Sequence, residues 1–153
     1  MKKGFVLLII FCTVVFGAFW YMDQNQPKQT DMPIVTATIV NKTFRLHAPQ
    51  TEKQRQTGLA AFDSLAQDEG MILRGMPVGR QSIWMKNMKF DIDVLWVNKD
   101  NQIIYIVQGM SKSDQQTIYH NPVNAPSAYV IELPDESCNK YGIATGQLVT
   151  IAN

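Results

Sequence analysis

Two continuous apolar runs constrain the fold of this chain more than any other feature. The runs are Val94–Val97 (VLWV) and Ile103–Val107 (IIYIV), separated by a short polar segment that ends at Asn101. A strand with one face in water alternates apolar and polar residues, whereas a strand covered on both faces is apolar throughout. Asn tolerates the positive φ of a tight turn. The pattern predicts a β-hairpin over residues 91–108, buried on both faces, at the centre of the core.

Shorter elements are expected around this hairpin. Thr51 and Gln54 have the spacing of a capping box at a helix start, and Gly58 favours a helix end close by. Asp135 is expected to cap a second short helix, closed by Gly142. Strands are predicted at 35–40, 43–46, 71–73, 82–85, 128–133 and 147–151, with a turn at 41–42 and a long polar connection at 109–127. This order predicts a β-rich α+β domain, either a small barrel or a curved antiparallel sheet with one or two short helices.

The N-terminal residues differ from the rest of the chain. Lys2 and Lys3 precede an uncharged apolar run, residues 4–22. As a helix this run would rise about 28 Å, close to the thickness of a bilayer's hydrocarbon core. Trp20 and Tyr21, near its end, are typical of residues at a membrane interface. We expect an uncleaved transmembrane anchor, and a cleaved signal segment is the alternative.

Anchor and signal segment predict the same side of the membrane for the globular domain, residues 34–153. Lysines before an apolar run stay in the cytoplasm, so this domain is expected on the extracytoplasmic side, periplasmic or extracellular. It would be secreted if the segment were cleaved. Residues 23–33 are polar and hold two prolines, and they are expected to form a tether.

The composition of the domain argues against several classes of function. From Ile34 to the C-terminus there are 11 Lys and Arg against 11 Asp and Glu, so the domain lacks the positive charge that nucleic acid binding requires. No catalytic triad order, glycine-rich phosphate loop or paired-cysteine motif occurs, and we expect no cofactor and no metal. Cys138 has no second cysteine in the domain to pair with, and it is expected to be a small buried residue.

Six short segments occur together in the order and spacing of one known family. They are Glu52–Leu59 (EKQRQTGL), Glu69–Met71 (EGM), Trp84–Asn87 (WMKN), Asp93–Val97 (DVLWV), Tyr129–Pro134 (YVIELP) and Gly142–Val149 (GIATGQLV). Through them the chain resembles the prokaryotic family of the domain of unknown function 192, DUF192. The resemblance covers residues 35–151 and implies a compact β-rich fold, often exported, with no particular activity. The chain departs from the family pattern at Met88, at Asp91–Asp93 and at Gln147.

The densest mixture of aromatic, cationic, amide and acidic groups begins at residue 84. Trp84, Lys86 and Asn87, together with Asp93, offer the ring face, donors and acceptors that a polar ligand requires. Glu69 and Glu132 are expected to join them in the fold. Glu132 stands in an apolar run, so its carboxyl would need a partner such as Arg55 or Lys86. A purely structural role for these residues is the alternative, with Asp93 tying down the segment after Trp84.

The leading hypothesis for function is a non-enzymatic binding or accessory module of the cell envelope. Its ligand would be a polar small molecule, a glycan or a partner protein. The second hypothesis is a hydrolase acting on envelope carbohydrate through Asp93 with Asp91 or Glu132, since two carboxyl groups can serve glycoside hydrolysis. A structural partner domain of a membrane complex is the third. Two carboxyl groups that converge in one cleft would favour the enzyme.

Overall fold

The computed structural model describes residues 30–152 of the chain. The predicted membrane segment, residues 4–22, and most of the predicted tether lie outside this range. Within it, no helix has the length and apolar character needed to cross a bilayer. The strands are β1 (Ile34–Ile39), β2 (Lys42–His47), β3 (Glu69–Leu73), β4 (Ser82–Trp84), β5 (Ile92–Val97), β6 (Ile103–Met110), β7 (Ile118–His120), β8 (Tyr129–Pro134) and β9 (Val149–Ala152). The helices are α2 (Glu52–Thr57), α3 (Ser137–Tyr141) and a short 3-10 helix, η1 (Gly58–Ala61).

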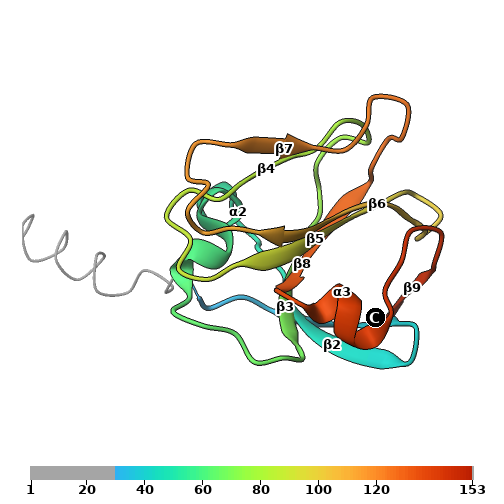
Figure 1. The fold of residues 1–153 in the computed structure, drawn as a ribbon, viewed down its shortest axis with the longest axis horizontal. Coiled ribbons are helices and arrows are strands. Elements are labelled where there is room, and N and C mark those ends of the chain that lie inside the picture. The colour runs from blue at the N-terminus through green and yellow to red at the C-terminus, as the bar shows by residue number, and fades with distance from the viewer. Residues whose placement is uncertain (1–29, 153) are drawn as a thin grey trace, which may run out of the picture. The chain divides into compact units, whose positions relative to one another are not determined.

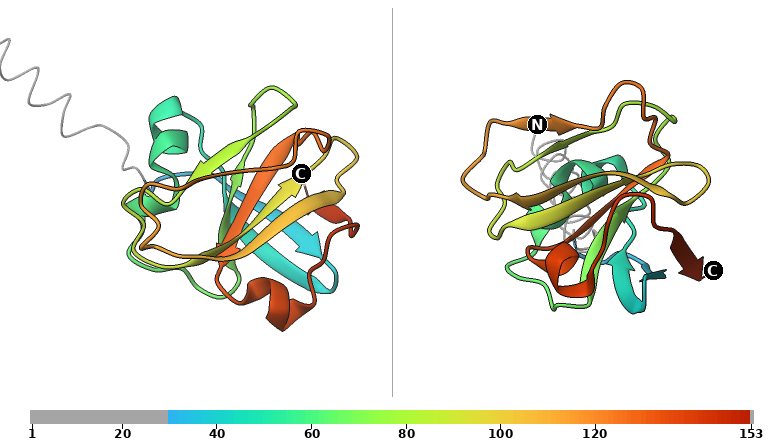
Figure 2. Two further views of the ribbon diagram at one scale, coloured as in Figure 1. Left: turned by 45° about the horizontal axis from the view of Figure 1, so that its top comes forward. Right: turned by 45° about the vertical axis from the view of Figure 1, so that its right-hand side comes forward.

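Seven of the strands form one curled sheet, in the order β6-β5-β8-β3-β2-β1-β9 (Figures 1 and 2). An isolated bridge between Gln102 and Leu148 brings the start of β6 to the start of β9, so the two ends of the sheet meet there. Strands β4 and β7 pair separately, and this small sheet lies beside β5 and β6. The predicted β-rich, barrel-like domain with short helices is confirmed. One neighbouring pair, β2 with β3, is parallel rather than antiparallel.

The predicted central hairpin is present, but its two strands differ in burial. β5 is buried at all six positions, and Asn101 in the turn has φ 60°. β6 is mostly half-buried, with Ile103 and Met110 among its few buried residues. The prediction of burial on both faces is therefore wrong for β6, which is the first strand in the sheet order. β8, paired with the other side of β5, is the second fully buried strand.

Continuous apolar sequence in the central strands is explained by two separate cores, one on each face of the sheet. Along β5, Leu95 and Val97 face the core enclosed by the curled sheet, whereas Val94 and Trp96 face the other. The same alternation holds in β8 and β3, because successive side chains of a strand point to opposite faces. α3 covers the first core, and η1 with β4 covers the second (Figure 1). Any polar side chain in β5 or β8 is thus assigned to one core or the other.

The first helix begins as the sequence predicts. The Gln54 N–H donates to Thr51 Oγ1 over 3.1 Å, and Gln54 Oε1 accepts the Thr51 N–H over 3.2 Å, which completes the capping box. Gly58 ends the helix with φ 55°, and the chain continues as η1. The capping box therefore fixes the residue at which α2 starts. Residues of α2 form one wall of a cleft that is described below.

The first hairpin turns one residue earlier than predicted. Ile39 pairs with Lys42, so Val40 and Asn41 form the turn. Val40, not Asn41, takes the positive φ, 56°. A β-branched residue is strained in this region of conformational space, so the pairing of β1 with β2 and β9 outweighs the local preference of the turn residues.

Close contact between β3 and β8 requires a glycine. A Cβ atom at Gly70 would collide with the backbone oxygen of Glu132 and with the Leu133 and Leu46 side chains. Since Met71 pairs with Glu132, this contact holds the middle of β8 tightly against β3. Gly70 is the centre of the EGM segment that carried the family resemblance, and its role here is packing.

Candidate functional site

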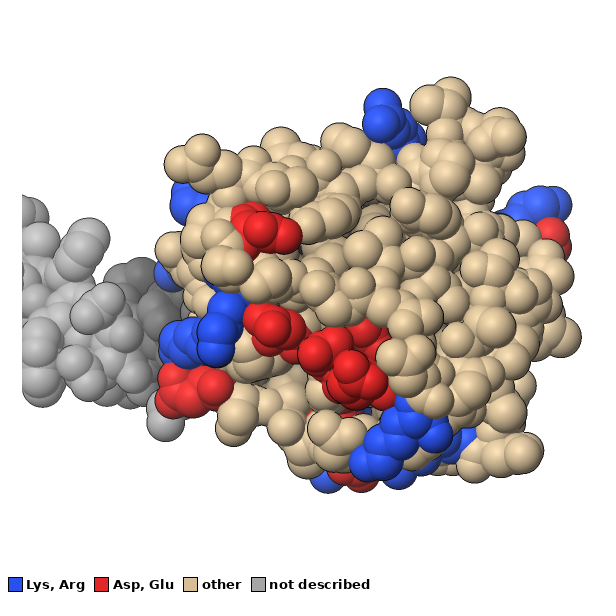
Figure 3. All heavy atoms as spheres, in the orientation of Figure 1, with Lys and Arg blue, Asp and Glu red and all other residues tan. Residues whose placement is uncertain are grey.

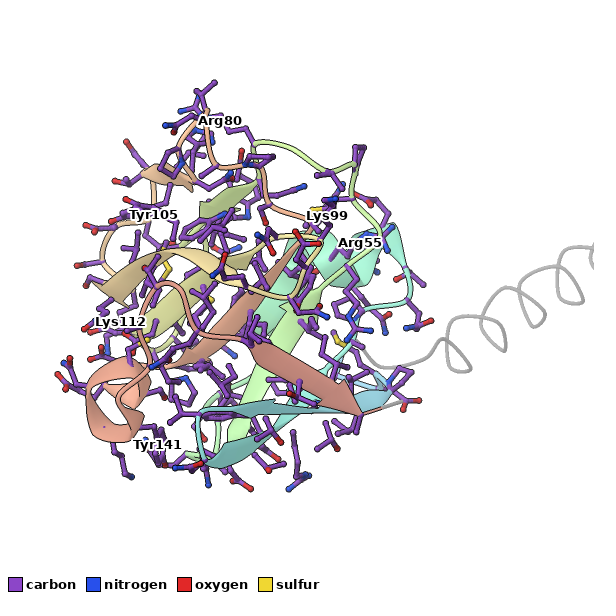
Figure 4. The ribbon with its side chains drawn as sticks, turned by 90° about the vertical axis from the view of Figure 1, so that its right-hand side faces the viewer. Arg55, Arg80, Lys99, Tyr105, Lys112 and Tyr141 are labelled. Carbon is purple, nitrogen blue, oxygen red and sulfur yellow. The ribbon has the colours of Figure 1, made fainter. Side chains whose placement is uncertain are left out.

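A cleft of about 240 Å³ lies on the side of the sheet that carries the second core. α2 and η1 form one wall, including Arg55, and β4 with the residues after it forms another. Residues of β3, β5 and β8 form its base. α2, with Arg55, and α3, with Tyr141, lie at opposite sides of the domain (Figure 4). The cleft is therefore built from segments far apart in sequence and joined only by the fold.

Glu132 places a carboxyl group at the base of the cleft. It lies opposite Val94 in the pairing of β8 with β5, and it is only 6% exposed. Within residues 30–152, no hydrogen bond or ion pair reaches its carboxyl oxygens, and burial alone raises its pKa to about 7. Because removing a carboxylate from water without a partner is costly, the proton is retained to a higher pH. This is a buried carboxyl group that a proton or a ligand can satisfy.

Trp84 forms an exposed aromatic wall of the same cleft. It ends β4, opposite Ile118 of β7, and is 48% exposed. The Lys86 ammonium lies 4.9 Å from the centre of the Trp84 ring, within the range of a cation–π interaction. Lys86 also lines the cleft. An exposed indole beside a buried carboxyl gives the cleft both a flat apolar surface and a polar base.

The two predicted partners of Glu132 line the cleft but bind elsewhere. Arg55 donates two hydrogen bonds to Glu52, of 2.9 and 3.1 Å, so this ion pair lies within α2. These bonds lower the pKa of Glu52. Lys86 is held over Trp84. The prediction that Arg55 or Lys86 pairs with Glu132 is therefore wrong for this structure, and Glu132 keeps its bonding capacity.

Asp93 lies on the opposite face of the sheet, away from the cleft. Its two carboxyl oxygens accept the Gly109 N–H over 2.9 Å and the Cys138 N–H over 2.8 Å, and the residue is 1% exposed. It therefore joins β5 to β6 and to the first turn of α3. The expected ties to the segment after Trp84 are not made. Asp93 also replaces the predicted cap from Asp135, since Glu136 is the N-cap residue and its side chain makes no cap bond.

Cys138 is buried beside this carboxylate. Its thiol pKa is raised by burial, by the negative charge of Asp93 and by a hydrogen bond to Asp93. A protonated thiol is a weak nucleophile, so the site favours the expected structural role.

The remaining predicted site residues lie outside the cleft. Glu69 pairs with Arg45 at 3.2 Å on the surface. Asn87 takes φ 60° in a turn, and its N–H donates to Gln115 Oε1 over 2.7 Å. Asp91 accepts the Lys112 N–H over 2.8 Å in a separate depression. Of the six residues predicted to form a ligand site, Trp84, Lys86 and Glu132 meet in one cleft.

Sequence reasoning missed most of the apolar lining of this cleft. Leu59, Leu73, Ile83 and Ile92 line it, together with the half-buried Met76 and Met88. Each belongs to an apolar pattern that predicts only burial, and no local signal separates the wall of a cleft from the inside of a core. The pairing of β5 with β8, which sets Glu132 beside this wall, is likewise a long-range contact.

These elements define a class of protein: a curled, β-rich domain with a cleft over one buried carboxyl group. The chain belongs to the DUF192 family, described as "Uncharacterized ACR", whose model matches residues 34–151. This confirms the resemblance carried by the six sequence segments. Among curated proteins, none matches the chain.

Two crystal structures are similar to the fold. One is from Sinorhizobium meliloti 1021 and is described as a candidate transcription regulator; its TM-score is 0.71 at 22% identity, covering 78% of this chain and 95% of that one. The other is a protein of unknown function from Novosphingobium aromaticivorans DSM 12444; its TM-score is 0.71 at 21% identity, covering 82% and 98%. At these identities the similarity shows the fold alone.

Proposed function

We propose that the domain is a non-enzymatic binding module that takes a small polar molecule in the cleft above Glu132. The observation that carries this proposal is the Glu132 carboxyl group, which is buried, faces the cleft and has no protein partner among residues 30–152. Apolar walls with a few convergent polar groups are typical of small-molecule sites.

The energetics of Glu132 support a ligand rather than a packing role. A buried carboxyl without a hydrogen-bond partner costs stability, by an amount on the order of 1–3 kcal/mol or more when it is charged. A strand position packed only for stability would hold an apolar residue, as its neighbours Ile131 and Leu133 do. A ligand that donates to Glu132 offsets this cost, so the unfavourable group becomes a source of affinity and specificity.

A thermal-shift screen of small polar molecules and short glycans on the full 153-residue chain tests the proposal. Ligands of the cleft are expected to raise the melting temperature, because they bind the native state. Glu132→Gln and Trp84→Ala should abolish the shift. Ile118→Ala is the matched control, since Ile118 is an exposed residue opposite Trp84 that does not line the cleft. A shift that survives both cleft variants would place binding elsewhere.

A macromolecular partner is a further outcome of the test. If the screen finds no small ligand, and a partner protein binds in a way that Trp84→Ala weakens, the cleft is a protein-docking site instead. A partner that is insensitive to every cleft variant would favour the third hypothesis, a structural domain of a membrane complex.

One observation favours an enzyme as the second candidate. Glu132 and Glu52 both line the cleft, and their pKa values are moved in opposite directions, as an acid and a base require. However, the oxygens of Glu52 accept bonds from Arg55 and Gln56 and lie in water. The pair of Asp93 with Glu132 is not available, because the two lie on opposite faces of the sheet and both oxygens of Asp93 are occupied. Binding is therefore the better-supported function.

The description of the S. meliloti protein suggests nucleic acid as a different partner. The charge of this chain favours the binding of a small ligand instead, since acidic and basic residues are equal in number from Ile34 onward. On the face drawn in Figure 3, charged side chains of both signs lie at several places around the molecule and form no basic stripe.

We further propose that the module works outside the cytoplasm, held by the apolar residues 4–22. Lys2 and Lys3 before this run support that orientation. A reporter that is active only outside the cytoplasm, fused after Asn153, should give a signal. A signal from a reporter active only in the cytoplasm would overturn the orientation, and fractionation would separate an anchor from a cleaved signal.

A further inference from the structure

We propose that the molecule recognised by the cleft carries a primary ammonium group on an aliphatic chain, with the ammonium on Glu132 and the chain along the apolar walls. This inference rests on the proposed binding function and names the chemical class of its ligand. An alkylamine or a lysine side chain has the required chemistry.

The charges that line the cleft differ in their exposure to water. Glu132 is the buried one, whereas Glu52 and Lys86 are exposed and Arg55 is half-buried. Water and salt weaken the field of exposed charges, while a buried charge is screened much less. At the base of the cleft, the negative carboxylate therefore dominates, although the rim carries both signs.

The positive groups of the rim are already engaged. Arg55 is paired with Glu52 at 2.9 Å, and the Lys86 ammonium lies over the Trp84 ring at 4.9 Å. Neither reaches Glu132. A cationic group from outside can therefore bind Glu132 without displacing a protein ion pair.

The apolar side chains of the lining explain why the ligand is expected to carry an aliphatic chain. The apolar part of the lining consists of the Trp84 ring and of six aliphatic or thioether side chains, while Gln56, Thr57 and Ser82 add polar groups; the six are Leu59, Leu73, Met76, Ile83, Met88 and Ile92. A sugar ring carries hydroxyl groups around its edge, and those that lie against the apolar part of the lining would lose their partners in water. An unbranched alkyl chain has no such groups, and each methylene that it removes from water strengthens binding.

A charged ligand gives the site a pH dependence with a definite sign. The titratable groups facing the cleft are Glu132 from β8, Glu52 and Arg55 from α2, and Lys86 after β4. The pKa of Glu132 is about 7 without ligand, so protonation at low pH removes the charge that binds ammonium. Affinity for an amine should therefore rise from pH 5 to pH 8, whereas affinity for a neutral alcohol should not.

Calorimetric titration of the full chain with n-pentylammonium, 1-pentanol and pentanoate tests the inference. At pH 8 the amine should bind at least about tenfold more tightly than the alcohol or the acid, as expected for a charge-assisted bond. Glu132→Gln should remove this preference, and Ile118→Ala should keep it. Equal affinity for amine and alcohol, or an amine preference that survives Glu132→Gln, would overturn the inference.

Additional probes distinguish a lysine side chain from a free amine. They also distinguish failure of the ammonium preference from failure of the binding function. Nα-acetyl-lysine amide, compared with n-pentylammonium, distinguishes a lysine side chain from a free amine by which binds more tightly. If none of the probes shows an ammonium preference but neutral molecules bind in a Trp84-dependent way, the inference fails and the binding function stands. If nothing binds the cleft at all, both fail. Circular dichroism of each variant confirms that lost binding is not lost folding.

Discussion

Asp93 and Glu132 are two buried carboxyl groups on adjacent paired strands, and their surroundings are opposite. Asp93 faces the core enclosed by the sheet, and both of its oxygens accept backbone N–H groups. Glu132 faces the cleft on the other side, and its oxygens accept none within the described part of the chain. The difference separates a carboxylate that holds the fold together from a carboxyl group whose hydrogen-bonding capacity the described residues leave unused.

The comparison also explains why a hydrolase that uses Asp93 with Glu132 does not fit. Asp93 is opposite Leu133 in the pairing of β5 with β8, and Glu132 is opposite Val94. Directly paired residues share a face, whereas neighbours along a strand do not. The two carboxyl groups are thus close in the sheet but separated by it, and no substrate can contact both.

Replacing Asp93 should have the largest effect. Asp93→Ala leaves the Gly109 and Cys138 N–H groups buried without an acceptor, which should lower the free energy of unfolding by about 2–5 kcal/mol. Chemical denaturation of the variant measures this loss. Asp100→Ala, at an exposed turn residue, is the control and should change little. A loss no larger than that of the control would show that Asp93 is not a structural carboxylate.

Replacing Glu132 should change how the free energy of unfolding depends on pH. The Glu132 pKa is about 7 in the folded state against 4.5 for the free group, so the folded state holds its proton to a higher pH. The stability contribution is fully present below pH 4.5 and is lost as pH rises to about 7, by up to roughly 3 kcal/mol. Glu132→Gln carries no titrating group, so it should gain stability relative to the native chain as pH rises from 4 to 8.

Parallel denaturation curves of the native chain and Glu132→Gln measure this difference at each pH. Other titrating groups, such as His47, contribute equally to both chains and cancel. A difference that is constant from pH 4 to pH 8 would mean that Glu132 has a solvated or partnered carboxyl, and the contrast with Asp93 would then disappear.

Replacing Trp84 should have the smallest effect on stability. Its side chain is 48% exposed, and the cation–π contact with Lys86 is worth about 0.5–1 kcal/mol. Trp84→Ala should therefore lower the melting temperature by no more than a few degrees, while it removes ligand binding at the cleft. A large loss of stability would place Trp84 with Asp93 among the structural residues.

The parts of the fold predicted from sequence are those set by local signals. The capping box of Thr51 and Gln54, the left-handed Asn101 and the apolar run of β5 each depend on a few neighbouring residues. Predictions failed where contacts with segments distant in sequence determine the turn conformation or the burial of a strand. Val40 takes the strained turn position because β1 pairs on both sides, and β6 is only half-buried because of its place in the sheet order.

The candidate site shows the same division between what local sequence predicts and what long-range contacts determine. The sequence identified Trp84, Lys86 and Glu132 as polar or aromatic groups of interest, but it also grouped them with Asp93, Asn87 and Glu69. Sequence spacing shows which side chains alternate along a strand, and it does not show which core each face will meet. α2 and β4 complete the cleft over Glu132 through contacts across the fold.

The family, the β-rich class and the presence of an acidic residue within a buried strand could all be inferred without a structure. Local propensity, periodicity and motif spacing are properties of short segments, so they are readable before the chain is folded. The folded chain was needed to show that Asp93 is bonded by two backbone N–H groups while Glu132 has no partner in residues 30–152. Hydrogen-bond satisfaction and burial depend on residues tens of positions away, because long-range strand pairing and helix packing determine which donors reach each carboxyl group.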